Sequence, residues 1–196
     1  MDIESIVAKL RARFGDAIGP VEQPEIEPII LVEPSRLADV AAFLRDDPDL
    51  ACDYLMCITG LDLPPEEPKK KEKVPPKKKG EDVPPPEGPA AQGPPPVYRT
   101  AVVYNLFSYR HRHRVTLKVV MPRDGAHVPT VTHLWPAVDW HEREAYDLVG
   151  VVFDGHPDLR RILLPDDWEG HPLRKDYQVQ EFYEIEGSTV RVPRGW

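Results

Sequence analysis

The chain has 196 residues, of which 41% are hydrophobic and 24 are proline, and its formal net charge at neutral pH is −8. This length allows one domain with a core of its own, together with appendages. The acidic balance argues against nucleic acid as the main partner, because phosphate binding needs a basic face. The N-terminus is too charged for a signal peptide, and no apolar run approaches the roughly 20 residues of a spanning helix, which predicts a cytosolic or peripheral protein.

The first 63 residues are predicted to form two helices and two strands in alternation. The first helix is the clearest, because its apolar residues recur at helical spacing between Asp2, which is placed to cap it, and Gly15, which is placed to end it. The predicted elements are a helix at 3–14, a strand at 27–33, a helix from 34 to 47 and a strand at 51–63.

A segment rich in proline and lysine follows at 64–96. It holds twelve prolines, seven lysines and six acidic residues. With so few apolar groups it cannot offset the roughly 1–2 kcal/mol per residue that ordering a backbone costs, so we predict that it is disordered. Residues 97–108 and 113–121 beyond it read as an antiparallel hairpin, because apolar and polar residues alternate in the second of them. The insertion therefore interrupts a loop between strands.

The C-terminal part combines a charged helix with a tail that has no period of its own. Residues 130–149 predict a turn and then a helix, whereas the stretch from Gly155 to Tyr177 keeps neither the strand nor the helix repeat and contains three prolines. Such a tail needs a surface to lie on, and we expect it to become ordered on a partner. The predicted fold class is α+β: a mixed four-stranded sheet with helices packed on one face, and an extended irregular C-terminal arm.

Three segments follow from these patterns. They are a single α+β domain formed by 1–63 and 97–150, the disordered insertion at 64–96, and a partner-docking arm at 151–196.

No residue pattern predicts a catalytic, cofactor-binding or metal site. Cys52 and Cys57 would face opposite sides of a strand, which disfavours a disulfide and favours two small buried apolar groups. Two cysteines are too few for an iron–sulfur cluster with the usual four ligands. The sequence HEREA at 141–145 lacks the second histidine of a helical zinc site, and neither a Gly-x-Ser-x-Gly elbow nor a glycine-rich phosphate loop occurs.

The helix and the tail together closely resemble the signature of the thirty-kilodalton subunit of respiratory complex I, the proton-pumping NADH:quinone oxidoreductase, in which this subunit is designated C. The resemblance covers more than twenty positions within about three dozen residues. The matching residues are Glu142-Arg143-Glu144, Tyr146-Asp147-Leu148, Gly150, Phe153, Gly155-His156-Pro157, Leu159-Arg160-Arg161-Ile162-Leu163, Pro165-Asp166 and Glu169-Gly170-His171-Pro172-Leu173-Arg174-Lys175-Asp176-Tyr177.

The resemblance implies a non-catalytic structural subunit of the peripheral, quinone-module arm of that enzyme, at the cytoplasmic face of the inner (plasma) membrane. Its partners would be the large quinone-module subunit, which is similar to the large subunit of nickel-iron hydrogenase, and other peripheral-arm subunits. Contact with the membrane would be indirect. Flavin and iron–sulfur clusters are then expected in partner subunits and no cofactor in this chain. The docking candidates are Glu142, Glu144, Asp147, Arg160, Arg161, His171, Arg174, Lys175 and Asp176, with Trp168 as an apolar anchor.

Two departures from the family pattern and three alternative functions remain. Many relatives have an aromatic residue where Val149 stands, and the insertion at 64–96 replaces a short connection. An equivalent subunit of a ferredoxin-, F420- or hydrogenase-linked membrane complex is the first alternative. A soluble metallohydrolase that uses the histidines is the second. A module that recruits anionic lipid through the lysines of the insertion is the third.

Overall fold

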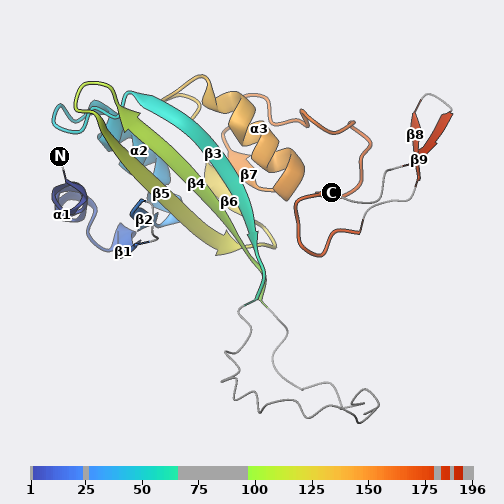
Figure 1. The fold of residues 1–196 in the computed structure, drawn as a ribbon, viewed down its shortest axis with the longest axis horizontal. Helices are drawn as coiled ribbons and strands as arrows, with labels where there is room; N and C mark the ends of the chain where they lie inside the picture. Colours follow the sequence, from blue (N-terminus) through green and yellow to red (C-terminus); the bar gives the residue numbers. More distant parts are fainter. Residues whose placement is uncertain (1, 24–26, 66–96, 179–181, 186–187, 192–196) are drawn as a thin grey trace, which may run out of the picture.

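The computed structural model describes residues 2–23, 27–65, 97–178, 182–185 and 188–191 (Figure 1). Nearly all of the insertion predicted at 64–96 lies outside these residues, so its disorder stays a prediction. The arm predicted at 151–196 is described as far as Gln178 and then as two short strands.

The described elements alternate between helices and strands in the first half and end in short strands. In chain order they are α1 (Ile3–Phe14), η1 (Gly15–Ala17), β1 (Ile18–Glu22), β2 (Ile29–Val32), η2 (Pro34–Arg36), α2 (Leu37–Asp46), β3 (Tyr54–Leu63), β4 (Arg99–Ser108), β5 (His113–Pro122), β6 (His127–Pro129), α3 (Val138–Val149), β7 (Val152–Asp154), β8 (Phe182–Ile185) and β9 (Ser188–Arg191). Within the described part of the chain, no helix is both long and apolar enough to cross a membrane.

The main sheet is mixed and has five strands in the order β1-β2-β5-β4-β3. Strands β2 and β5 are parallel, and the other neighbours are antiparallel. The α+β class with a mixed sheet is thus confirmed, but the sheet has one strand more than the predicted four. The additional strand is β1, whose sequence Ile-Gly-Pro-Val-Glu contains two residues that weaken a strand pattern. It is an edge strand, where a proline is tolerated.

The helices start and end at residues that satisfy the exposed backbone groups of their termini. The carboxylate of Asp2 accepts a hydrogen bond from the Ser5 amide at 3.0 Å, and Gly15 ends α1 with a positive φ of 55°. Both ends of α1 therefore lie where the sequence predicts them. Helix α3 also ends at a glycine, Gly150, which adopts a left-handed φ of 85°.

One face of the sheet is covered by helices and the other is open. On the covered face Ile58, Tyr104, Leu117 and Ile30 are buried on four adjacent strands, and they form a single core with apolar residues of α1, α2 and α3. Helix α3 lies against β3 at Gly60, where an added Cβ would be 3.1 Å from the Val149 side chain. Figure 1 views the sheet from the open face, with α2 and the short β6-β7 pair behind the strands.

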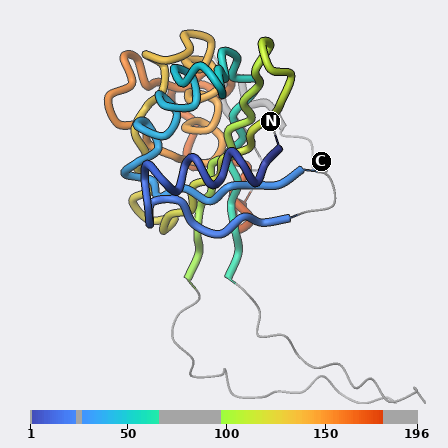
Figure 2. The backbone as a smooth tube through the Cα atoms, turned by 90° about the vertical axis from the view of Figure 1, so that its left-hand side faces the viewer, coloured from blue at the N-terminus to red at the C-terminus, as the bar shows by residue number. Residues whose placement is uncertain are grey.

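The predicted hairpin is confirmed, and a long strand pair flanks the insertion. Strands β4 and β5 pair from Ser108 with His113 to Arg99 with Pro122. Strands β3 and β4 pair up to Leu63 and Arg99, so the two residues lie side by side at one end of the sheet, as Figure 2 shows.

The two cysteines lie in different environments and form no disulfide. Cys52 precedes β3 and is fully buried in the core, whereas Cys57 is half-buried and accepts a hydrogen bond from Asn105. The predicted role as a small buried apolar group therefore fits Cys52 better than Cys57.

Candidate docking surface

The arm that follows β7 is held on helix α3 by the carboxylate of Asp147. This side chain is fully buried. Its Oδ2 atom accepts hydrogen bonds from the backbone amides of three successive arm residues, Ile162, Leu163 and Leu164, at 3.1, 2.8 and 2.9 Å. Within the described residues, this irregular stretch has no neighbouring strand or helix turn to accept the hydrogen bonds of these amides, and the Asp147 carboxylate accepts them instead.

Arg161 completes the site of Asp147. Its guanidinium donates to Asp147 Oδ1 at 2.7 Å and also to the carbonyl oxygens of Trp168 at 2.8 Å and Gly170 at 3.2 Å. Burial alone would raise the pKa of the Asp147 carboxyl, but the hydrogen bonds from the Leu164 amide and from Arg161 outweigh it, so the pKa is lowered. Asp147 therefore stays charged at neutral pH, and the ion pair links the two halves of the arm.

The last turn of α3 is capped by the arm. The carbonyl of Asp147 accepts from His171 Nδ1 at 2.8 Å, that of Leu148 from the Leu173 amide at 3.0 Å, and that of Val149 from Arg174 Nε at 2.7 Å. These are carbonyls that a helix terminus leaves without an internal partner, and a cation is favoured there by the helix dipole.

Gly150 makes this approach possible. A Cβ at this position would overlap Arg174 Nη2 and would lie 2.7 Å from the ring of His171, so only glycine leaves space for both side chains. Burial lowers the pKa of His171, although its hydrogen bond to the Asp147 carbonyl opposes the shift. The ring is thus neutral at physiological pH and donates through Nδ1.

Residues 175 and 176 of the arm are fixed to the sheet by a second group of charges. The Lys175 amide donates to the buried carboxylate of Asp62 on β3 at 2.8 Å. Arg123 pairs with Asp176 at 2.9 Å and lies 3.8 Å from Asp62. The arm therefore contacts α3 through residues 160–174 and the sheet through residues 175 and 176.

A separate buried cluster fixes the start of α3. Glu142 is fully buried and accepts from the hydroxyl of Thr130 at 2.5 Å and from the Val131 amide at 2.9 Å. The buried ring of His156 lies 3.8 Å from Glu142 and 3.1 Å from Asp139. Burial raises the pKa of Glu142 to about 7 despite its hydrogen bonds. This carboxylate holds the β6-α3 turn, so its side chain is not part of a surface.

The predicted docking residues fall into three groups by exposure. Glu142 and Asp147 are buried; Arg161, Trp168, His171 and Arg174 are half-buried; and Glu144, Arg160, Lys175 and Asp176 are exposed. The structure brings Asp147, Arg161, His171 and Arg174 together, with contacts inside the chain. The expectation that the arm is ordered only on a partner does not follow from these contacts, and a docking role for the ten residues stays a prediction.

Sequence reasoning missed four residues of the site as anchors: Asp62, Arg123, Arg143 and Gly150. Arg143 is buried and donates to the carbonyls of Arg160 and Arg161, both at 3.2 Å. A signal existed for two of the four. Asp62 follows Ile58 and Gly60 on the inward side of a strand, and Gly150 stands at the end of a predicted helix.

Three large apolar side chains remain exposed on this side of the molecule. They are Trp140 on α3, 62% exposed, and Leu163 and Leu173 on the arm, 62% and 55% exposed. The backbone amide of Leu163 donates to Asp147 and that of Leu173 to the Leu148 carbonyl, so both leucines present apolar surface to solvent from a fixed backbone. Among the described residues, no three or more His, Cys, Asp or Glu side chains are grouped to hold a metal ion.

Known proteins share both the sequence and the fold. The model of the family described as "Respiratory-chain NADH dehydrogenase, 30 Kd subunit" matches residues 30–183. The NADH-quinone oxidoreductase subunit designated C from Chlorobium phaeobacteroides is 40% identical over 186 residues, which cover 94% of this chain and 91% of that protein. The protein of the same name from Roseiflexus castenholzii is 39% identical over 176 residues, covering 90% of this chain and 84% of the other.

Two solved structures have the same fold. The trypsin-resistant fragment of Nqo5 superposes with a TM-score of 0.54 at 26% identity, covering 81% of this chain and all of the fragment. A chain of the archaeal membrane-bound sulfane sulfur reductase gives a TM-score of 0.60 at 20% identity, covering 95% of this chain and 98% of the other, which is a likeness of fold alone. From the family match and these relatives, the chain belongs to the family of the 30 kDa subunit of respiratory-chain NADH dehydrogenase.

Proposed function

We propose that this chain is a structural subunit of a proton-pumping NADH:quinone oxidoreductase and that it docks through its arm and helix α3 on the large quinone-module subunit. Membership of such an enzyme is supported by the curated relatives, which are named as subunits of NADH-quinone oxidoreductase. In this proposal the subunit lies at the cytoplasmic face of the membrane and touches no lipid itself.

The observation that carries the proposal is an arm that is fixed in the chain but leaves leucines uncovered. Burying one leucine side chain is worth about 1.5–3 kcal/mol, so Leu163 and Leu173 together are a substantial anchor. Because Asp147 and Arg161 already hold the backbone of the arm, little conformational entropy is lost when these leucines bind. Pre-organisation of this kind favours a permanent interface.

We further propose that the chain contributes no redox group. The charged residues of the site are used in hydrogen bonds to backbone carbonyls and amides, as the contacts of Asp147, Arg161 and Arg174 illustrate. In the proposed complex, flavin and iron–sulfur clusters lie in other subunits. The role of this subunit is to hold the quinone module together.

A charge placed on the exposed leucines tests the docking. In membranes that contain the full complex, the double variant Leu163→Asp and Leu173→Asp should lower co-purification of the large subunit, and NADH:quinone activity with it, by at least about tenfold, because a loss of 1.4 kcal/mol already changes an affinity tenfold. The matched control is Ala8→Asp, since Ala8 is an exposed apolar residue of α1, which lies at the opposite side of the molecule from the arm in Figure 1.

The isolated double variant should keep the circular dichroism and melting temperature of the wild-type chain, because neither leucine side chain is buried. Normal assembly of this variant would contradict the docking role. A loss of assembly with Ala8→Asp as well would mean that the effect is not specific to the arm.

A further inference from the structure

The tip of the β4–β5 hairpin carries a cluster of exposed aromatic rings. Tyr109 is 62% exposed, and its ring centroid lies 5.6 Å from that of Tyr54 and 5.1 Å from that of Phe107. Tyr54 is itself 45% exposed, and Met56, two residues further along β3, is 39% exposed. Aromatic rings that pack on each other at the surface, away from the core, form an apolar patch at this end of the open face.

The same tip is the most basic short stretch among the described residues. Its sequence at 109–114 is Tyr-Arg-His-Arg-His-Arg, in a chain whose net charge is −8. Arg114 pairs with Glu27 at 2.7 Å, whereas no described carboxylate pairs with the exposed Arg110 or Arg112. The carboxylate of Asp53 accepts a hydrogen bond from the Tyr109 amide at 3.0 Å. Two guanidinium groups are therefore available beside the rings.

The backbone of the tip is held in one shape. The amides of His111 and Arg112 donate to the side chain and the carbonyl of Ser108, at 3.2 and 2.8 Å. The His111 ring donates to the Pro48 carbonyl at 2.8 Å and stacks on His113. A tip fixed by contacts to two other segments presents its side chains with little loss of freedom on binding.

A small pocket opens beside the aromatic rings on the open face. It has a volume of about 130 Å³ and is lined by Met56, Asn105 and Arg114, among others. Its floor is polar at one side, where Thr116 donates to Asn105 and Asn105 donates to the Cys57 sulfur. This space suits one apolar side chain of medium size.

We propose that the tip patch, formed by Tyr54, Met56, Phe107, Tyr109, Arg110 and Arg112, binds an acidic segment of a neighbouring subunit that also inserts an apolar side chain into the pocket. Tyrosine, arginine and methionine are enriched where binding energy concentrates in protein interfaces. Two guanidinium groups that no described carboxylate neutralises, on an acidic chain, select carboxylates, which they can bind in bidentate fashion.

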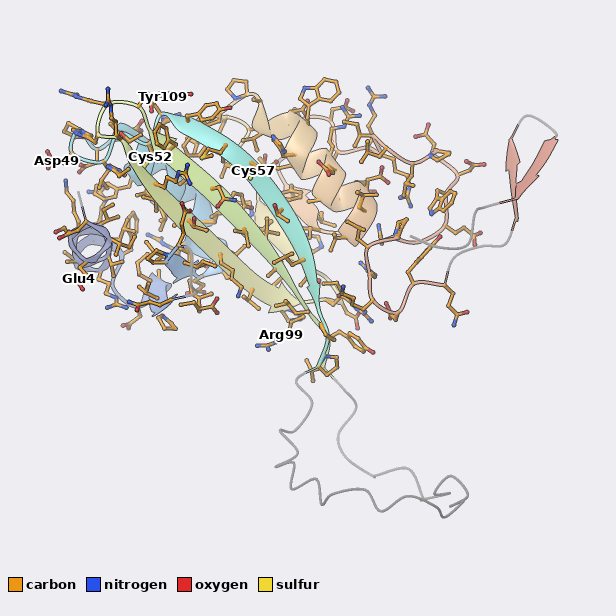
Figure 3. All side chains as sticks on the ribbon, in the orientation of Figure 1. Glu4, Asp49, Cys52, Cys57, Arg99 and Tyr109 are labelled. Atoms are coloured by element: carbon orange, nitrogen blue, oxygen red, sulfur yellow. The ribbon has the colours of Figure 1, made fainter. Side chains whose placement is uncertain are left out.

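This surface is distinct from the arm and does not depend on the docking proposed above. In Figure 1 the β4–β5 turn and the arm lie at opposite sides of the molecule. Figure 3 shows Tyr109 at that turn and Cys57 further along β3. A protein partner is favoured over a membrane or nucleic acid because Asp49 and Asp53 border the tip, so that the described residues form no broad basic face there.

Photo-cross-linking in the intact complex tests the proposal. Tyr109 is replaced by benzoylphenylalanine, which keeps an aromatic ring at the tip, and the control carries the same group at Glu4, an exposed residue of α1. We expect the Tyr109 probe to join a peptide of another subunit that contains several Asp or Glu residues, with a yield well above that of the Glu4 probe. No product above that control would overturn the proposal, as would a product with lipid, RNA or a second copy of this chain.

Charge variants of the tip separate its electrostatics from its shape. Arg110→Glu combined with Arg112→Asp should lower the cross-link yield about tenfold, because like charges placed opposite each other across an interface repel. Aspartate is chosen because Arg112 has a φ of 53°, which aspartate tolerates. Arg110→Lys with Arg112→Lys keeps the charge but removes the bidentate geometry, so the yield should fall by less than in the acidic variant. An unchanged yield in the acidic variant, at an unchanged melting temperature of the isolated chain, would reject the acidic partner.

Discussion

Replacing Asp147 by asparagine should release residues 162–164 from helix α3 while the rest of the domain stays folded. The buried carboxylate accepts three backbone hydrogen bonds at 2.8–3.1 Å and pairs with Arg161 at 2.7 Å. Asparagine has the same shape, but its amide nitrogen cannot accept and Arg161 loses its counter-charge. Breaking a buried pair by changing one partner costs about 3–5 kcal/mol, and even the lower value raises the local opening constant more than about 100-fold.

Hydrogen exchange in the isolated chain measures this release directly. The amides of residues 162–164 should be protected in the wild type and exchange at least about 100-fold faster in Asp147→Asn, whereas the Leu117 amide at the centre of the sheet should not change. Asp158→Asn serves as the control, because it removes only the exposed ion pair with Arg160. Unprotected amides in the wild-type chain would refute the reasoning and would show that the arm needs a partner to be ordered.

The protection should also depend on pH in one direction. The pKa of Asp147 is lowered by the hydrogen bonds that it accepts from Leu164 and its neighbours, which outweigh the effect of burial. An acid whose pKa is lower in the folded state stabilises that state above its unfolded pKa, and the contribution is lost as the pH falls through the folded value. Equal protection at pH 5 and pH 8 is therefore expected, with loss only in strong acid.

Two further predictions concern Glu142 and Gly150. Because burial raises the pKa of Glu142 from 4.5 to about 7, the folded chain binds more protons than the unfolded one in this range, so stability should fall by at most about 3 kcal/mol as the pH rises through it. Glu142→Gln should remove this fall in denaturant melts at pH 5 and pH 8, and equal slopes in both proteins would contradict it. Gly150→Ala should cost about 1–2 kcal/mol for its φ of 85° and more for the clash with Arg174, whereas Gly125→Ala, with a φ of 74° and open space around it, costs only the first amount. Equal losses of unfolding free energy in the two alanine variants would show that the arm does not press on Gly150.

The elements that sequence predicted are those whose signal is local. Asp2 and Gly15 bound a helix whose apolar residues repeat at helical spacing, and the alternation in β5 identified the hairpin. What sequence could not show depends on contacts between distant segments. The pairing of β1 with β2 overrides a Gly-Pro sequence, and Asp147 reads as a surface charge until the backbone of residues 162–164 is placed on it.

The sequence located the region of the site but not the contacts that its charged residues make. The contacts that Asp147, Arg161, His171 and Arg174 make within the chain could not be read from the sequence, because a list of residues does not tell which of them are buried. Their predicted docking on a partner stays a prediction. The contact of Asp62 could not be predicted either, because its hydrogen-bond partner Lys175 is 113 residues away along the chain and no local pattern links the two.

The long pairing of β3 with β4 holds Leu63 and Arg99 side by side at one end of the sheet. The two strands stay in register as far as Leu63 and Arg99, at the end of the sheet opposite the β4–β5 tip. Whatever joins these two residues can therefore be shortened, lengthened or exchanged for a reporter domain for about 0.6 kcal/mol of closure entropy per doubling of its length. This end of the sheet is thus a natural attachment point for labels in studies of the assembled enzyme.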